Sequence, residues 1–152
     1  MQYKSYFTNN PSETKKLGQK LAKDILSHSQ KKGAFVIGLI GDLGSGKTTF
    51  LQGFAKGLEI KEKILSPTFV ILKKFKVQGS KFKAFYHIDC YRIKKAKELL
   101  DLGFRKIISE PENIVAIEWA DYVQGLLPKN TLIIKFDSIA QNTRRVRMKQ
   151  WK

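Results

Sequence analysis

The sequence predicts an α/β fold in which a mixed, mostly parallel β-sheet is flanked by helices. Three observations support this fold class. The apolar run over 34–40 has the composition of a buried parallel strand, and the run over 114–118 has the same character. Apolar residues recur at helical spacing over 50–58. Two strand-like segments, 68–77 and 81–91, are separated by a short polar turn and indicate a β-hairpin.

The segment between the first apolar strand and the following helix carries the pattern G-x-x-x-x-G-K-[ST], which is typical of a phosphate-binding loop. Its residues are Gly41, Asp42, Leu43, Gly44, Ser45, Gly46, Lys47 and Thr48. The glycines allow a tight turn whose N–H groups point into one nest, and the helix N-terminus that follows favours an anion. Lys47 supplies a mobile positive charge, and the Thr48 hydroxyl can ligate Mg²⁺. Strand, loop and helix together predict a three-layer fold like that of the P-loop NTPases.

The elements of the N-terminal half follow from capping residues and periodicity. Ser12 can cap a first helix with apolar positions between Leu17 and Leu26, and the segment 31–33 ends it. The helix after the glycine-rich loop is expected to end near Gly57. The segment 64–67 is then a short connection into the hairpin, whose turn is 78–80.

The C-terminal half predicts shorter elements. A polar helix over 94–102 should turn Leu99 and Leu100 inward, and an irregular or helical piece follows between Gly103 and Pro111. The strand over 114–118 comes next. Two segments, 131–136 and 144–151, predict a closing pair of strands.

Length and composition set the class of protein. A chain of 152 residues with 42% hydrophobic residues is expected to form one domain, 1–152, around one core. The sequence has no apolar stretch long enough to cross a bilayer, and residues 1–10 lack the apolar core of a signal peptide. Cys90 is the single cysteine and so has no internal disulfide partner. We therefore expect a cytoplasmic protein with no membrane association.

The charge balance is strongly basic. Lysine and arginine number 29 against 13 acidic residues, which gives a formal net charge of +16. Such a charge favours phosphate-rich partners, nucleic acid above all, although a lysine-rich solvated surface would produce the same count. Most lysines are scattered along the chain, whereas 144–149 forms a dense basic patch. Both explanations stay open at the level of the sequence.

Two carboxylates at strand ends are candidates to complete a metal site beside the loop. Glu118 directly follows four apolar strand residues, and ligand groups gather at the carboxyl ends of strands in open α/β sheets. Asp89 ends the second strand of the hairpin and could bind metal through water or pair with Arg92. The sequence does not decide which carboxylate holds the metal directly. His87 shares a face with Asp89 but is assigned no catalytic role, because a half-buried structural histidine is the more common case.

The connection after the loop helix carries Ser66-Pro67-Thr68, where P-loop proteins often place a segment that responds to the γ-phosphate. Pro67 stiffens this segment and Thr68 offers a hydroxyl, although an ordinary turn into a strand is the simpler explanation. The chain contains no guanine-specific Asn-Lys-x-Asp loop. That absence favours ATP over GTP as the nucleotide.

Four blocks in order resemble the bacterial TsaE (YjeE) family, the small ATPase of threonylcarbamoyladenosine (t6A) tRNA modification. The family pattern is G-D-L-G-x-G-K-T-T, S-P-T-[FY], H-x-D-x-Y-R and E-W, and the matching segments are 41–49, 66–69, 87–92 and 118–119. Thr14, Leu17 and Gly18 also match the family's T-x-x-L-G. The resemblance covers about residues 12–147, with Ser45 where many members have alanine.

The resemblance implies a cytoplasmic protein that binds ATP or ADP with Mg²⁺ and hydrolyses ATP. Its partners would be TsaD and TsaB, which modify adenosine 37 of tRNA, and tRNA would be met through that complex. The loop 41–49, Thr14 and one of Arg144 or Arg145, of which we take Arg145, would contact the nucleotide. Thr48, Glu118 and Asp89 would form the metal site. Lys47, Asp89, Glu118 and Thr68 would be the catalytic set.

Two other functions compete with this assignment. A small-molecule kinase on the same scaffold would also need the loop, Mg²⁺ and arginines, but the sequence offers no arginine-rich lid and no recognisable acceptor site. A non-enzymatic RNA-binding module would explain the charge, yet no RRM or KH signature is present. Because no arginine is obviously aimed at the phosphates, we expect slow hydrolysis by the isolated chain and stimulation by a partner.

Overall fold

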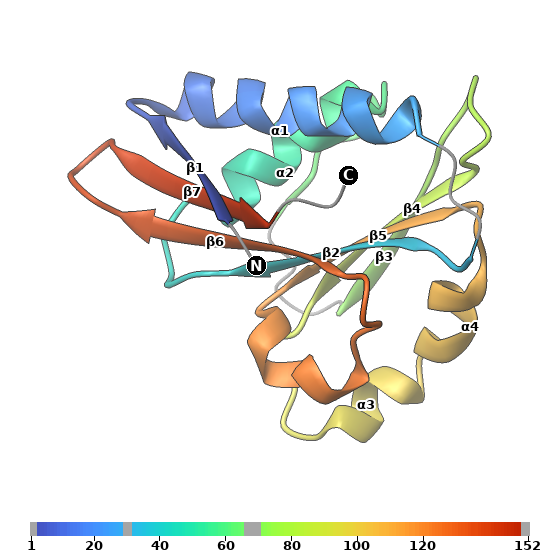
Figure 1. The fold of residues 1–152 in the computed structure, drawn as a ribbon. Helices are drawn as coiled ribbons and strands as arrows, with labels where there is room; N and C mark the ends of the chain where they lie inside the picture. Colours follow the sequence, from blue (N-terminus) through green and yellow to red (C-terminus); the bar gives the residue numbers. More distant parts are fainter. Residues whose placement is uncertain (1–2, 29–31, 66–70, 150–152) are drawn as a thin grey trace.

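A mixed β-sheet forms the middle layer of the molecule (Figure 1). The computed structural model describes residues 3–28, 32–65 and 71–149. Within them the strands are β1 (Tyr3–Thr8), β2 (Phe35–Ile40), β3 (Leu72–Lys76), β4 (Ala84–Asp89), β5 (Asn113–Glu118), β6 (Leu132–Ser138) and β7 (Arg144–Lys149). Their order across the sheet is β1-β7-β6-β2-β5-β4-β3. The strands β6, β2, β5 and β4 are parallel, while β7, β1 and β3 add antiparallel edges.

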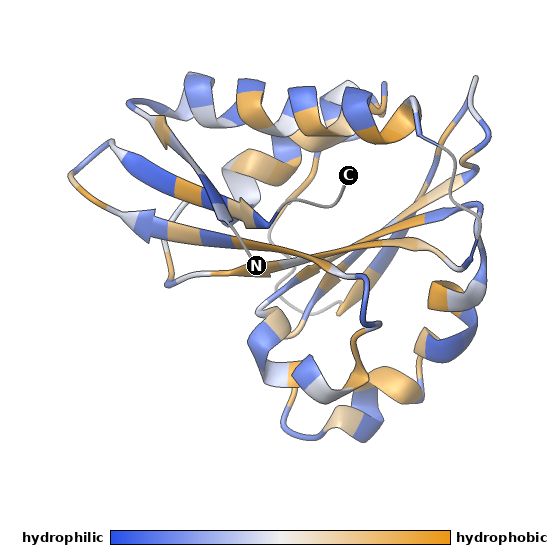
Figure 2. Cartoon of the chain, viewed as in Figure 1, coloured by the Kyte–Doolittle hydropathy of each residue, from blue (hydrophilic) through white to orange (hydrophobic). Residues whose placement is uncertain are grey.

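Helices cover the sheet from both sides, which confirms the predicted α/β architecture. On one side lie α1 (Pro11–Leu26) and α2 (Lys47–Gly57), and on the other lie α3 (Ala96–Leu100), α4 (Phe104–Ser109) and the 3₁₀ helix η1 (Ala120–Leu126) (Figure 1). Figure 2 shows the apolar central strands between these layers. Alternation along β2 explains the two cores: Phe35, Ile37 and Leu39 pack toward α1 and α2, while Val36 packs toward the other helices. A strand buried on both faces needs a continuous apolar run, which is what the sequence has.

The first helix starts before the predicted cap. Asn10 is the N-cap, and its side-chain oxygen accepts a hydrogen bond from the Glu13 N–H at 2.9 Å. Glu13 in turn accepts from the Asn9 N–H at 2.8 Å, and Pro11 occupies the first helical position. The assignment of the cap to Ser12 is therefore wrong, because Ser12 already lies within the first turn.

The hairpin prediction is confirmed, with shorter strands. β3 and β4 pair antiparallel, and the Val77 N–H donates to the Lys83 carbonyl near a turn in which Gly79 has a φ of +71°. The described part of the first strand begins at Leu72, and residues 66–70 lie outside the described residues. The closing strands are confirmed as the antiparallel pair β6–β7.

Three elements differ from expectation. β1 and η1 were not predicted, because both are polar and carry little periodicity; β1 is held by its pairing with β7. The polar helix predicted over 94–102 is only α3, since the N–H groups of Lys94 and Lys95 donate to the Glu98 carboxylate and leave these residues before the helix. Leu99 is buried as predicted, whereas Leu100 is only partly buried.

Three glycines bring the backbones of α1 and α2 into direct contact. A Cβ on Gly53 would lie 1.9 Å from the Lys15 carbonyl oxygen, and one on Gly18 would lie 2.1 Å from the Phe50 carbonyl oxygen. A Cβ on Gly57 would lie 2.6 Å from the Gln19 carbonyl oxygen. α2 does end at Gly57, as predicted, but this glycine serves helix packing rather than the left-handed turn that ends the helix.

Glu59 makes that left-handed turn, with a φ of 62°, and the Ile60 N–H closes it by donating to the Ala55 carbonyl at 2.9 Å. Because a side chain in this region is strained, we expect Glu59→Gly to raise the free energy of unfolding by about 0.5–1 kcal/mol, measured by urea denaturation. Glu62→Gly is the control, since Glu62 is exposed and not in this region, and the extra chain entropy should lower stability there. Equal effects of the two substitutions would contradict the strain at Glu59.

Candidate functional site

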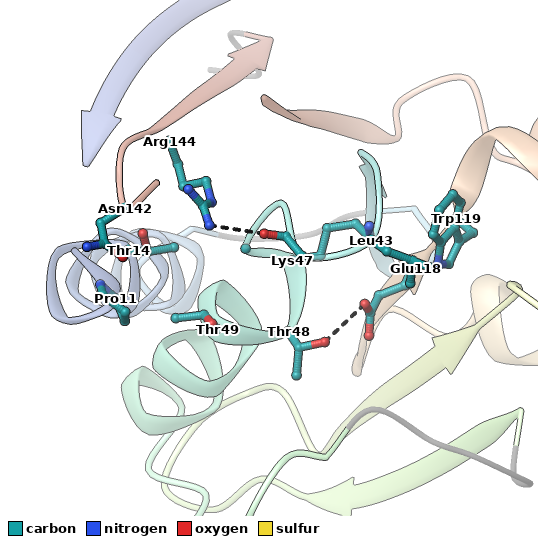
Figure 3. Close-up of a pocket in the computed structure, with 12 residues that line it drawn as sticks. Pro11, Thr14, Leu43, Lys47, Thr48, Thr49, Glu118, Trp119, Asn142 and Arg144 are labelled. Atoms are coloured by element: carbon teal, nitrogen blue, oxygen red, sulfur yellow. Dashed lines mark hydrogen bonds between the residues drawn. The ribbon is translucent and has the colours of Figure 1, made fainter. Parts of the chain in front are cut away.

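A pocket with a volume of about 190 Å³ lies where the glycine-rich loop meets the N-terminus of α1 and the ends of β5 and β7 (Figure 3). Its lining residues are Pro11, Thr14, Leu43, Gly44, Gly46, Lys47, Thr48, Thr49, Glu118, Trp119, Asn142 and Arg144. The loop follows the C-terminal end of β2, and Glu118 is the last residue of the neighbouring parallel strand β5. The pocket therefore forms at the sheet edge where ligands of open α/β sheets are held.

The loop has the backbone that its glycines allow. Gly44 and Gly46 have φ values of +76° and +105°, and α2 begins directly after Gly46 with no side-chain cap on its first turn. At Gly41 a Cβ would lie 2.6 Å from the Ser45 Oγ and 2.8 Å from the Phe136 carbonyl oxygen. Within the described residues, the buried Ser45 Oγ has no hydrogen-bond partner. An uncapped helix start behind a tight loop is suited to an anionic group.

The Lys47 amine is folded back onto its own loop. Its Nζ donates to the carbonyl oxygens of Gly41 and, at 2.9 Å, of Asp42, and it lies 4.2 Å from the centroid of the Trp119 ring. Burial lowers the pKa of Lys47, while the negative charges of Glu118, Asp89 and Asp42 act in the opposite direction. The amine is thus held at the pocket by backbone carbonyls that an anion could replace.

Glu118 is buried between two partners, one for each carboxylate oxygen. Its Oε2 accepts a hydrogen bond from the His87 Nε2 at 2.6 Å, and its Oε1 accepts from the Thr48 Oγ1 at 3.4 Å. Glu118 and His87 are both 2% exposed, which leaves the carboxylate little freedom to move. Figure 3 shows the contact between Thr48 and Glu118 at the start of α2. The structure thereby gives His87 a role in orienting Glu118 that the sequence did not reveal.

Asp89 lies opposite Glu118 in the register of β4 and β5. Its Oδ1 accepts a hydrogen bond from the Tyr91 N–H at 2.9 Å. The ion pairs among the described residues do not include the pairing with Arg92 that the sequence left open. Among the described residues no three His, Cys, Asp or Glu side chains cluster as a metal site by themselves. Of the three predicted metal ligands, Thr48 and Glu118 are among the described residues that line the pocket, and Asp89 is not. Hydroxyl and carboxylate oxygens are ligands that Mg²⁺ accepts, and a ligand's own phosphates can supply further oxygens.

Burial raises the pKa of Asp89 from its usual 3.8, with Glu118 adding to the shift, while its hydrogen bond to Tyr91 acts against it. The folded state therefore binds the Asp89 proton more tightly than the unfolded chain does. The stability that this provides is complete below pH 3.8 and is lost as the pH rises through the higher folded pKa.

Above its folded pKa, the Asp89 carboxylate therefore works against the stability of the fold. We expect Asp89→Asn, which keeps an acceptor for the Tyr91 N–H, to raise the unfolding free energy at pH 7 by on the order of 1 kcal/mol. The gain should shrink as the pH is lowered toward 4, and thermal denaturation at a series of pH values measures it. A loss of stability at pH 7 would show that the charge is compensated in the fold.

Of the other predicted site residues, some line the pocket and some do not. Thr14, in the first turn of α1, lines the pocket beside Gly46, and its Oγ1 lies 2.7 Å from the Thr8 Oγ1. Arg144 donates from Nη2 to the Gly44 carbonyl at 3.1 Å, whereas Arg145 is paired with Asp137. Arg144 therefore lines the pocket, whereas Arg145 is not among its lining residues, and the nucleotide contact assigned to Arg145 stays a prediction. Thr68 lies outside the described residues.

Sequence reasoning did not find Pro11 and Asn142, which line the pocket from α1 and from the connection between β6 and β7. No local motif marks either residue. Trp119, which the sequence placed only within the E-W block, lines the pocket with a left-handed backbone, φ 57°. Its ring contacts those of Tyr91 and Tyr122, at centroid distances of 4.9 Å and 5.3 Å. A non-glycine residue in this conformation directly after Glu118 fits the usual clustering of strain at functional sites.

The fold and the glycine-rich loop together define a protein of the P-loop class. A family model for "Threonylcarbamoyl adenosine biosynthesis protein TsaE" matches residues 8–146. The chain belongs to the TsaE family.

Relatives and a solved structure agree with this assignment. The tRNA threonylcarbamoyladenosine biosynthesis protein TsaE of Bacillus subtilis is 34% identical over 91% of this chain and 80% of its own length. The protein of that name from Haemophilus influenzae is 33% identical over 80% of this chain and 74% of its own length. The crystal structure of YdiB from B. subtilis superposes with a TM-score of 0.72 at 29% identity, covering 97% of this chain and 84% of that one. In the described part of the chain, no helix has the length and apolarity to cross a membrane.

Proposed function

We propose that this protein is a Mg²⁺-dependent ATPase that acts with TsaB and TsaD in the threonylcarbamoylation of tRNA adenosine 37, in the cytoplasm. The observation that carries the proposal is the contact between the Thr48 hydroxyl and Glu118, 3.4 Å apart, directly behind the phosphate-binding loop. Membership of a family named for t6A biosynthesis connects that site to tRNA modification.

The loop residues would bind the phosphates of ATP or ADP. The N–H groups between Gly41 and Thr49 would surround them, and Lys47 would exchange its contacts with the Gly41 and Asp42 carbonyls for contacts with phosphate oxygens. The orphan Ser45 hydroxyl is a further donor at this loop. Thr14, Pro11 and Asn142 would form the side of the pocket away from Glu118.

Thr48, Glu118 and Asp89 would hold Mg²⁺, which when bound neutralises charge on the phosphates. His87 would be a positioning residue, because it fixes one oxygen of Glu118 and leaves the other toward Thr48. The buried surroundings of Glu118 and Lys47 strengthen their electrostatic effect.

Hydrolysis by the isolated chain should be slow. Arg144 is the arginine at the pocket, but its guanidinium donates to the carbonyls of Gly44, Ala140, Gln141 and Thr143. It is therefore engaged with backbone rather than free to stabilise charge on a transferring phosphoryl group. A partner that repositions Arg144, or that supplies another cation, would accelerate turnover.

The experiment is ATP hydrolysis by the purified chain with and without Mg²⁺, then with the cognate TsaB and TsaD added. We expect slow Mg²⁺-dependent turnover alone and a clear increase in the mixture. If the partners do not change the turnover, the proposed assembly with TsaB and TsaD would be contradicted, while the proposed ATPase activity would stand. Transfer of the γ-phosphate to a metabolite by the pure protein would instead favour the small-molecule kinase.

A further inference from the structure

In the described part of the chain, no helix covers one side of the sheet along β1, β7 and most of β6. The inward residues of these strands, among them Tyr6, Val146 and Phe136, belong to the core beneath α1 and α2. The core on the other side, beneath α3, α4 and η1, draws its described strand residues from β2, β3, β4 and β5 and from none of these three strands. Figure 1 shows the same arrangement, with the three strands extending past the lower helices. We call this uncovered surface the open face.

The open face carries alternate residues of the three strands. They are Tyr3, Ser5 and Phe7 on β1, Arg145, Arg147 and Lys149 on β7, and Lys135 and Asp137 on β6. Cross-strand pairing aligns them in rows: Ser5, Arg147 and Lys135 form one row. Side chains alternate between the two sides of β7. Because Val146 and Met148 are buried in the core, Arg145, Arg147 and Lys149 of the basic patch lie on the open face.

Charge on the open face is strongly unbalanced. Arg145 and Arg147 share one carboxylate, that of Asp137, at 3.1 Å and 2.9 Å, while Lys135 and Lys149 have no ion pair among the described residues. The Arg147 Nε is buried without a hydrogen-bond partner there, so its guanidinium is not saturated. A surface with four cations and one anion attracts a polyanion.

Two aromatic rings lie among these cations. Phe7 is 62% exposed and is paired in register with Arg145, and Tyr3 is 39% exposed with the Lys135 Nζ 5.0 Å from its ring centroid. Exposed rings are unfavourable in water, but they can stack on unpaired bases while lysine and arginine contact the phosphates. This combination distinguishes a nucleic-acid surface from a merely solvated basic one.

We propose that the open face of β1, β7 and β6 is an RNA-binding surface, separate from the nucleotide pocket. β7 connects the two, since Arg144 lies at the pocket and Arg145 on the open face. A second copy of the chain is a poorer occupant, because two such faces would bring like charges together. The proposal does not require ATP hydrolysis, and so its test contains no nucleotide.

The test is binding of a fluorescently labelled tRNA transcript to the full chain at several salt concentrations. The double variant Lys135→Glu/Lys149→Glu should bind at least tenfold more weakly, with a salt slope smaller by roughly 1.5–2, as expected for the loss of two phosphate contacts. The matched control is Lys16→Glu/Lys20→Glu, which changes the net charge equally on the exposed side of α1. Phe7→Ser should weaken binding several-fold with an unchanged salt slope.

A selective loss in the open-face variant, with circular dichroism showing that both variants are folded, would support the proposal. Equal losses in the two charge variants would overturn it, because binding would then reflect net charge alone. No binding of the transcript at low salt would also overturn it. Anionic vesicles that bind through the same lysines when the transcript does not would assign the face to a membrane surface instead.

Discussion

Glu118→Gln is expected to lower ATP hydrolysis by about 100-fold or more, if the proposed function is correct. Glutamine keeps the volume of the side chain and can bond to His87 and Thr48, but it removes the negative charge that would face Mg²⁺. Loss of one preorganised electrostatic group in a buried site commonly has an effect of this size. Steady-state hydrolysis at saturating Mg²⁺ and ATP measures it, with circular dichroism to show that the fold is intact.

Asp121→Asn is the matched control. Asp121 is an exposed carboxylate on η1 that also acts on the charge of Lys47. Removing it changes the local charge equally, yet it should alter turnover by less than about threefold, because exposed charges are screened by solvent. Normal hydrolysis in the Glu118 variant would remove Glu118 from the metal site and leave Asp89 as the carboxylate to test.

Gly53→Ala should lower the free energy of unfolding by about 2–4 kcal/mol, although alanine favours a helix by up to ~1 kcal/mol over glycine. The added Cβ would meet the Lys15 carbonyl oxygen at 1.9 Å. The backbone of α2 fixes the position of this Cβ, and the oxygen belongs to the backbone of α1, so no side-chain rotation can relieve the clash. The helices must then separate, and α1 carries Thr14 while α2 carries Lys47. Urea denaturation measures the loss, and nucleotide affinity should fall with it.

Gly125→Ala provides the comparison for Gly53, since nothing lies within 4 Å of a Cβ placed at Gly125 in η1. We expect a change there of no more than about 0.5 kcal/mol. If the two substitutions were equally tolerated, the close approach of α1 and α2 would not be a constraint on the fold.

Local patterns were the part of this structure that the sequence could predict. The loop 41–48 and the strand before it are contiguous, and their function follows from residue types at fixed spacing. Glu118 was found because it directly follows an apolar run, and the parallel pairing of β2 and β5 then places it near Thr48.

Features that depend on pairing between distant segments could not be predicted from the sequence. β1 has no apolar period of its own, so its existence depends on β7. The choice between Arg144 and Arg145 depends on strand register, because a shift of one residue exchanges the faces. The contact of His87 with Glu118 joins residues 31 positions apart, and only the alignment of β4 with β5 brings them together.

The pairing of β1 with β7 has a consequence for the order in which the chain folds during its synthesis. Tyr3 is aligned with Lys149, so β1 finds its partner only after β7, which lies far along the chain, has been synthesised. Until then, the glycine-rich loop lacks its contact with Arg144, and the strands of the open face are not yet paired. Pairings this far apart in sequence form late. We therefore expect the pocket and the open face to form only after β7 has paired with β1 and β6.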